Sequence, residues 1–189
     1  MELLTGIFTA FGLSASAGLN AYIPLLTISL LAKFTNLINL QSPWDTLTSW
    51  WVIGLLSLLI TIEFFADKMP AVNHINDFIQ TFVRPIAGAI VFAASANVLT
   101  DISPVLSLGA GVLVSGSVHT VKSVAVRPAL TATTGGVANT PVSIAEDIVS
   151  TFLSILAILI PIIIGITLVL IATTFIWVKW RKANTLQTN

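Results

Sequence analysis

Residues 63–88 read EFFADKMPAVNHINDFIQTFVRPIAG and form the largest group of polar side chains in an otherwise strongly apolar chain. Of the 189 residues, 56% are hydrophobic and only 8% are charged, whereas an ordinary soluble domain carries roughly 25% charged residues. Several apolar runs approach the ~18–20 residues that cross a hydrocarbon core of ~30 Å. The sequence therefore predicts an all-α integral membrane protein, with residues 1–189 forming a single bundle.

The composition also excludes some functions. The formal net charge is zero, and the interior has no basic tract, so the charge pattern of a nucleic-acid-binding protein is missing. The chain has no cysteine, which excludes disulfides and thiolate metal sites. No cofactor is predicted. The expected partners are the lipid bilayer and, as an open alternative, further copies of the chain.

We expect about five transmembrane segments. They are residues 3–31, 51–65, 86–99, 105–126 and 148–178. The first is too long for one straight crossing, and Pro24, after Gly18 and Asn20, favours a broken helix. The alternative is one tilted helix whose small residues face a neighbour. The last segment contains Pro161 and Gly165 and is also expected to break.

An amphipathic helix is predicted near residues 72–83, between the second and third segments. Its apolar side would carry Val72, Ile75, Phe78, Ile79 and Phe82, and its polar side His74, Asp77, Thr81 and Arg84. This spacing has the period of a helix with two different faces. We expect Arg84-Pro85 to close this helix, because the residue before a proline disfavours helical backbone.

The fourth segment carries small residues on one face. Ser107, Gly111, Ser115 and His119 recur every four residues, and Lys122 follows about one turn later. Small faces pack against other helices rather than against lipid. The pattern therefore predicts that His119 and Lys122 point into the bundle.

Residues 127–141 are rich in glycine, proline and threonine, which predicts a loop. Its backbone amides and Asn139 either face a ligand or only complete the turn. Ser143-Ile-Ala-Glu146 then matches a capping box, with Asp147 as a second favourable charge, and we favour capping over a binding role. Lys179, Arg181 and Lys182 predict a cytoplasmic C-terminus.

Seven short motifs carry a resemblance to a known family. They are GLNAYIP (18–24), ADKMP (66–70), RPIAG (84–88), HTVK (119–122), RP (127–128), TGG (134–136) and SIAED (143–147). Together they resemble a bacterial family of small hydrophobic membrane proteins described as a domain of unknown function. The resemblance implies a bacterial inner-membrane location and no established activity. The family often has an acidic residue just after the Lys-x-Pro turn, where this chain has Asn73, and this difference weakens a metal site there.

The predicted substrate site gathers the polar residues of both halves of the chain. They are Asn20, Glu63, Asp67, Lys68, Asp77, Arg84, His119, Lys122, Arg127, Asn139, Glu146 and Asp147. Ionisable groups inside a membrane are costly and usually face one another or a wet cavity. The acids nearly balance the bases, so one interpretation is ion pairing that only fixes helix packing. The other is that these residues surround a substrate or a proton path.

Metal and catalytic roles are weaker interpretations. His74 and Asp77 have a spacing that allows joint metal ligation, but a solvated helix face explains them equally well, and we predict no metal. His119 beside Lys122 suits either a proton relay or a structural hydrogen bond, and we favour the latter.

Three functional hypotheses follow. The first is a transporter or channel-like protein, in which broken helices bring backbone polar groups, Arg84, Lys122 and Arg127 to a cavity for a small anion, an ion or a lipid phosphate. The second is a structural or assembly protein whose charges only specify packing. The third, which we favour least, is a lipid-modifying enzyme with His74 or His119 as base.

Overall fold

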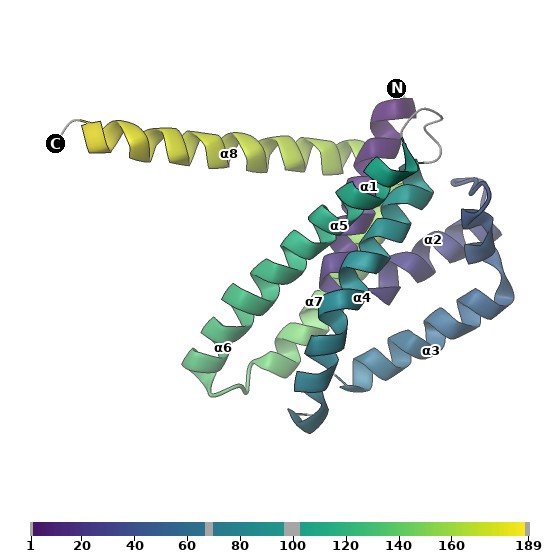
Figure 1. Ribbon diagram of the computed structural model, residues 1–189, viewed down its shortest axis with the longest axis horizontal. Coiled ribbons are helices and arrows are strands. Elements are labelled where there is room, and N and C mark those ends of the chain that lie inside the picture. Colours follow the sequence, from purple (N-terminus) through teal and green to yellow (C-terminus); the bar gives the residue numbers. More distant parts are fainter. Residues whose placement is uncertain (1, 67–69, 97–102, 188–189) are drawn as a thin grey trace.

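The structure, a computed structural model, describes residues 2–66, 70–96 and 103–187, and within these ranges it is helical with no strand. In chain order the helices are α1 (Glu2–Leu19), α2 (Tyr22–Phe34), η1 (Trp44–Thr48), α3 (Trp50–Ala66), α4 (Pro70–Ala96), α5 (Pro104–Thr120), η2 (Val121–Val126), α6 (Arg127–Thr134), α7 (Asn139–Leu159) and α8 (Pro161–Gln187). Figure 1 shows their arrangement.

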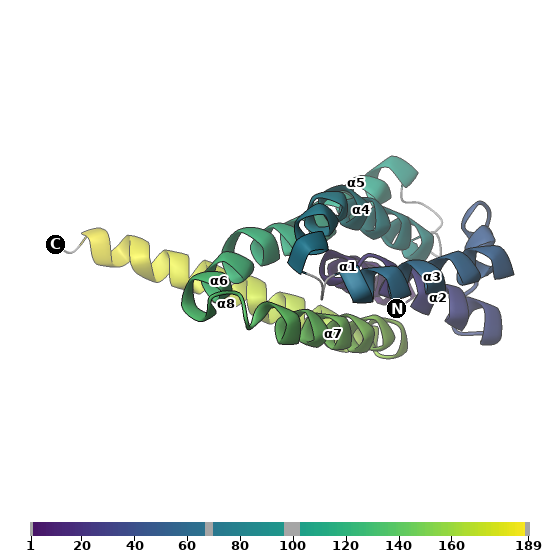
Figure 2. The same ribbon diagram turned by 90° about the horizontal axis from the view of Figure 1, so that it is seen from below.

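Helix α1 forms the centre of the bundle. It packs against α4, α5 and α7, which surround it in Figures 1 and 2. Its small and apolar side chains, including Ala10, Leu13 and Ala17, are fully buried. Helices α2 and α3 lie to one side of this core, and α8 runs away from it in Figure 1. The small residues of α1 therefore allow three other helices to meet around it.

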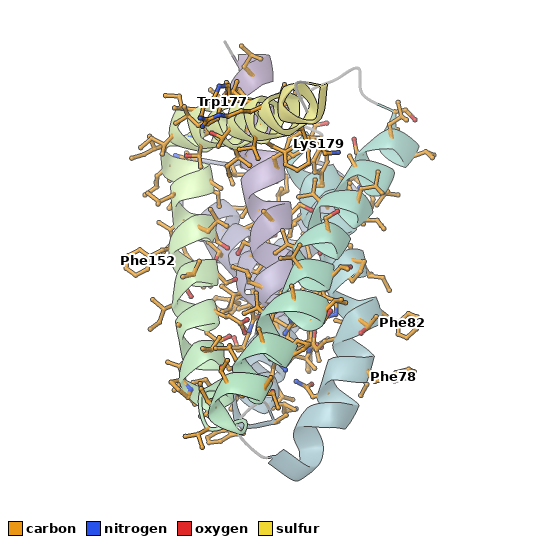
Figure 3. The ribbon with its side chains drawn as sticks, turned by 90° about the vertical axis from the view of Figure 1, so that its left-hand side faces the viewer. Phe78, Phe82, Phe152, Trp177 and Lys179 are labelled. Carbon is orange, nitrogen blue, oxygen red and sulfur yellow. The ribbon has the colours of Figure 1, made fainter. Side chains whose placement is uncertain are left out.

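The lengths and apolar surfaces of the helices are those of a membrane protein. Three of them, Phe78–Ala96, Pro104–Thr134 and Asn139–Leu159, are long and apolar enough to cross a bilayer. Shorter apolar helices run over Leu4–Leu19, Tyr22–Phe34, Trp50–Ala66 and Val169–Lys179. Large apolar side chains such as Phe78, Phe82 and Phe152 point outward (Figure 3) and are well exposed. The predicted all-α membrane fold is confirmed.

The break predicted in the first segment lies between α1 and α2. Helix α1 ends at Leu19 and α2 begins at Tyr22. The Asn20 side-chain Oδ1 accepts hydrogen bonds from the backbone N–H groups of Tyr22 at 3.0 Å and Ile23 at 3.1 Å. These are amides that a helix start leaves without an internal partner. Asn20 therefore caps α2 and allows the chain to turn inside the bundle.

A second predicted break separates α7 from α8 at Pro161. Proline has no N–H, so it cannot donate to the carbonyl of Ala157, four residues earlier. The Thr9 hydroxyl of α1 donates to this carbonyl at 2.8 Å instead. The backbone group that Pro161 leaves open is thus satisfied by a different helix, as buried backbone groups in a membrane require.

We expect Thr9→Val to lower the free energy of unfolding by about 1–3 kcal/mol, the cost of leaving a buried carbonyl without a donor. The loss should be smaller in a Pro161→Ala background, because the substituted alanine supplies its own N–H to the Ala157 carbonyl. Thr173→Val is the control, since the Thr173 hydroxyl bonds only within its own exposed helix. Unfolding in mixed micelles measures all three, and equal losses at Thr9 and Thr173 would contradict the assignment.

The predicted amphipathic helix forms, but Arg84-Pro85 does not close it. Helix α4 is continuous from Pro70 to Ala96, with Pro85 inside it. The prediction of a helix boundary there was therefore wrong. Proline is tolerated within membrane helices. Beside it, Ser115 of α5 donates its hydroxyl to the carbonyl of Arg84 at 2.6 Å, which joins α5 to α4.

The loop predicted over residues 127–141 is also largely wrong. The helical path of α5 continues through the π-helical η2 and then α6, and only a short turn at Gly135 and Gly136, both with positive φ, precedes α7. Pro128 explains η2, because its ring clashes with the carbonyl four residues earlier. A wider π turn avoids this clash, and the Arg127 N–H bonds the Lys122 carbonyl, five residues back.

The predicted capping box does not exist. Helix α7 begins at Asn139, so Ser143 and Glu146 lie inside the helix rather than at its start. A capping box needs the serine at the boundary. Glu146 instead pairs with Lys122, and Asp147 accepts a hydrogen bond from Asn20.

Helices α4 and α5 approach closely through glycines. A side chain at Gly111 would overlap the Gly88 carbonyl and lie 2.6 Å from the Cα of Ala89. The face that includes Ser107, Gly111, Ser115 and His119 is buried, so the prediction of an inward small face is confirmed. Close backbone approach through small residues is a common way for helices to associate in membranes.

Candidate functional site

The innermost part of the site joins α3, α4 and α5. The Arg84 Nη2 lies 3.1 Å from the Glu63 Oε1, and the exposed fractions of the two side chains are 1% and 2%. The Arg84 Nη1 lies 3.3 Å from His119 Nδ1. One guanidinium therefore holds a carboxylate from α3 and an imidazole from α5.

This arrangement fixes the state of His119. A guanidinium always donates, so Nδ1 of His119 must accept the hydrogen bond from Arg84. The ring is then neutral, with its proton on Nε2, which lies 3.3 Å from the Thr81 hydroxyl. Neither ring nitrogen has a free lone pair, so His119 is poorly placed to serve as a general base.

A second ion pair joins η2 to α7. The Lys122 Nζ lies 2.6 Å from the Glu146 Oε2 and donates to the Leu19 carbonyl at 3.1 Å. The Leu19 carbonyl is one of those left open where α1 ends. The Arg127 Nη2 lies 3.9 Å from the same Glu146 oxygen. The broken helix and the ion pair therefore meet at Lys122.

The π geometry of η2 explains why both cations reach Glu146. In an α-helix, residues five apart point about 140° away from each other, since each residue turns the chain by about 100°. A π turn, with its i→i+5 hydrogen bond, brings residues five apart closer to one face of the helix. Lys122 and Arg127, which have this spacing along η2, therefore face the same carboxylate.

Asn20 links the helix break to α7. While its oxygen caps α2, its Nδ2 donates to the Asp147 Oδ1 at 2.9 Å. Deeper along the α1–α7 contact, the Ser16 hydroxyl lies 2.8 Å from that of Ser150 and 2.7 Å from that of Ser154. The two helices are therefore joined by buried hydrogen bonds, which hold helices together in membranes.

These groups form one cluster, which we call the buried polar cluster. Its members are Asn20, Glu63, Arg84, His119, Lys122, Glu146 and Asp147. Arg84 and Lys122 lie within range of mutual electrostatic repulsion, which connects the two ion pairs. The cluster therefore brings together residues from both halves of the chain.

Other predicted site residues lie elsewhere. Arg127 is at the edge of the cluster, while Asn139 bonds Thr131 in the turn between α6 and α7. Asp67 and Lys68 lie outside the described residues, and the same holds for the side chains of His74 and Asp77. In the part of the chain that the structure describes, no three His, Asp or Glu side chains gather as a metal site.

Sequence reasoning missed Gln80 and Tyr22. Gln80 lies one turn before Arg84 on α4, is 1% exposed, and hydrogen-bonds the phenol of Tyr22. The spacing of four between Gln80 and Arg84 was the available signal. The Gln80 Oε1 and the Arg84 Nε are both buried without a partner among the described residues. Such atoms are rare in folded proteins, and a water molecule, an ion or a ligand commonly satisfies them.

Comparison with known proteins gives a family but no activity. A family model described as a domain of unknown function (DUF4126) matches residues 7–181. No curated protein matches the chain. No solved structure matches it either.

Proposed function

Because the chain belongs to the DUF4126 family, whose function is unknown, we propose a function from the geometry of the buried polar cluster. The protein is a transporter or channel-like protein that moves a small anion or other small ion across a bacterial inner membrane. The basic end of α8 lies on the cytoplasmic side. Discontinuous helices whose ends face buried charges are typical of transporter binding sites.

One observation carries this proposal. The Arg84 Nε and the Gln80 Oε1 are a donor and an acceptor, one turn apart on α4, buried and without a partner among the described residues. A cluster that only fixes packing satisfies most of its buried polar atoms, since each unsatisfied one costs about 1–3 kcal/mol. A small guest that accepts from Arg84 and donates to Gln80, such as a hydrated or protonated anion, offsets this cost.

A structural role is the second candidate. Two balanced ion pairs lie within the cluster, Glu63 with Arg84 and Lys122 with Glu146. Balanced buried pairs are costly to desolvate, and in some proteins they serve to specify packing. This interpretation predicts a stable protein through which nothing moves.

The test is ion flux in proteoliposomes. Wild-type protein is reconstituted and exposed in turn to gradients of H⁺, Na⁺, K⁺, chloride and phosphate. We expect at least one flux, and Gln80→Leu should lower it about tenfold or more, as losing a hydrogen bond worth about 1.4 kcal/mol would. The leucine removes the acceptor and the hydrogen bond to Tyr22, but it removes no member of either ion pair.

Phe78→Leu is the matched control, because Phe78 lies on the same helix and faces outward. It should leave the flux unchanged. Monodisperse elution and an unchanged melting temperature show that Gln80→Leu still folds. If folded wild-type protein moves none of these ions, or if folded Gln80→Leu moves them as well as wild type, the transport proposal is wrong and the structural role is favoured.

A further inference from the structure

A cleft opens beside the second ion pair. It has a volume of about 360 Å³ and lies where α1 ends, between the α5–η2 segment and α7. Four aliphatic side chains line it, among them Leu19 and Val121, together with Ser117 and the Lys122–Glu146 pair. This volume is at the lower end of the range for small-molecule sites, which run from about 300 to 1,000 Å³.

The cleft opens toward lipid. Its walls belong to Pro104–Thr134 and Asn139–Leu159, two of the helices long enough to cross the bilayer. Large apolar side chains are exposed on the same walls, with Val121 61% and Ile148 52% exposed. Apolar surface on helices of this length faces hydrocarbon. An acyl chain therefore suits the open side of the cleft.

The inner end of the cleft carries positive charge. The Lys122 side chain is 5% exposed, and its Nζ contacts Glu146 at 2.6 Å and the Leu19 carbonyl at 3.1 Å. A second cation, Arg127, lies 3.9 Å from the same Glu146 oxygen. Two cations thus converge on one acceptor position at the end of an apolar slot. This combination complements an amphiphile with an anionic headgroup.

A phosphate suits this end better than a carboxylate. A phosphate monoester carries up to two negative charges and three strong acceptor oxygens, whereas a carboxylate carries one charge and two oxygens. The phosphate can contact both cations while Glu146 stays in place, and it has a third oxygen and up to one more negative charge than a carboxylate. We propose that the cleft binds a phosphate-bearing lipid, with its acyl chain along Leu19 and Val121 and its phosphate at Lys122.

This inference goes beyond the proposed function, because the cleft lies at the Lys122–Glu146 pair and not at Gln80 and Arg84, and its test measures binding rather than flux. If lipid binding fails while ion flux persists, only the inference falls. If binding succeeds and nothing is transported, the lipid site stands without the transporter.

The experiment uses the purified full chain in neutral detergent and follows its melting temperature. The probes are dodecyl phosphate, laurate, dodecanol and inorganic phosphate. Dodecyl phosphate at about 100 times its Kd should raise Tm by about 5–10 °C. Laurate should bind more weakly, and dodecanol and inorganic phosphate should cause little shift, since each lacks one half of the ligand.

Two variants localise the binding. Ser117→Trp fills the cleft from an exposed position, and Lys122→Gln/Glu146→Gln removes both charges together, so that neither is left unpaired. Both should weaken dodecyl phosphate binding by about tenfold or more. Leu113→Trp, one turn earlier on the same helix and 71% exposed, should not.

Several results would overturn the proposal. If dodecanol raised Tm as much as dodecyl phosphate does, the phosphate charge would play no part in binding. If inorganic phosphate alone raised Tm as much, the alkyl chain of the ligand would play no part. Tighter binding of laurate would overturn the phosphate assignment. Unchanged binding in a folded Ser117→Trp protein would place the lipid elsewhere.

Discussion

Arg84→Leu is expected to lower the free energy of unfolding by about 3–5 kcal/mol, the usual cost of removing one partner of a buried ion pair. The reason is the environment of Glu63. Its side chain is 2% exposed, and Arg84 is the cation at 3.1 Å from its Oε1. Without this cation, the carboxylate must stay buried without its counterion or take up a proton. The same change removes the hydrogen bond to His119 Nδ1.

A double-mutant cycle separates the ion pair from the loss of side-chain volume. Glu63→Leu/Arg84→Leu replaces both charges with apolar groups, and it should recover most of the stability lost in Arg84→Leu, as in other proteins where buried pairs were replaced together. Unfolding in mixed micelles at neutral pH provides the four free energies. If the double variant is as unstable as the sum of the single variants, then the pair is not the cause of the loss.

Gly111→Ala is expected to destabilise the protein by about 1–3 kcal/mol, the typical cost of overpacking. The added methyl group would overlap the Gly88 carbonyl, and backbone cannot move aside as a flexible side chain can. Helices α4 and α5 would have to separate. Because Arg84 and His119 lie on these two helices at 3.3 Å from each other, the separation would also weaken the buried polar cluster.

Gly109→Ala is the matched control. Gly109 lies two residues away on the same helix, and a methyl group there meets nothing within 4 Å. Alanine is favoured over glycine inside a helix by roughly 0.5–1 kcal/mol, so this variant should be as stable as wild type or slightly more stable. If both alanine variants show the same stability, the contact between the two helices is not as close as described.

The helical membrane fold could be predicted from the sequence because it depends on local signals. Apolar run length, the four-residue spacing of Ser107, Gly111, Ser115 and His119, and the breaks near Pro24 and Pro161 are all contained in short windows. Two predictions based on proline failed. Pro85 lies inside the continuous helix α4, and a wider π turn accommodates Pro128. Neither outcome is visible in a local window, because membrane helices tolerate proline that would end a helix in water.

The candidate site could be predicted only in part. The residue types were identified, but the pairings were not, because the partners lie far apart in the chain. Asn20 and Asp147 are separated by 127 positions, and Glu63 and Arg84 by 21. For Glu146, a local pattern suggested capping, while its true partner is Lys122 on another helix. Local capping rules have no information about such contacts.

The π-helical segment η2 makes the path of the helix a matter of chain length. Removing one residue between Lys122 and Arg127 would let an ordinary α-helix form there, with the two cations four residues apart instead of five. Residues four apart also share one face of an α-helix, so both cations would still face Glu146. The ring of Pro128 would, however, clash again with the carbonyl four residues before it. A related chain that is one residue shorter here would thus keep its charge pairing but be forced to kink where this chain passes smoothly from α5 into α6.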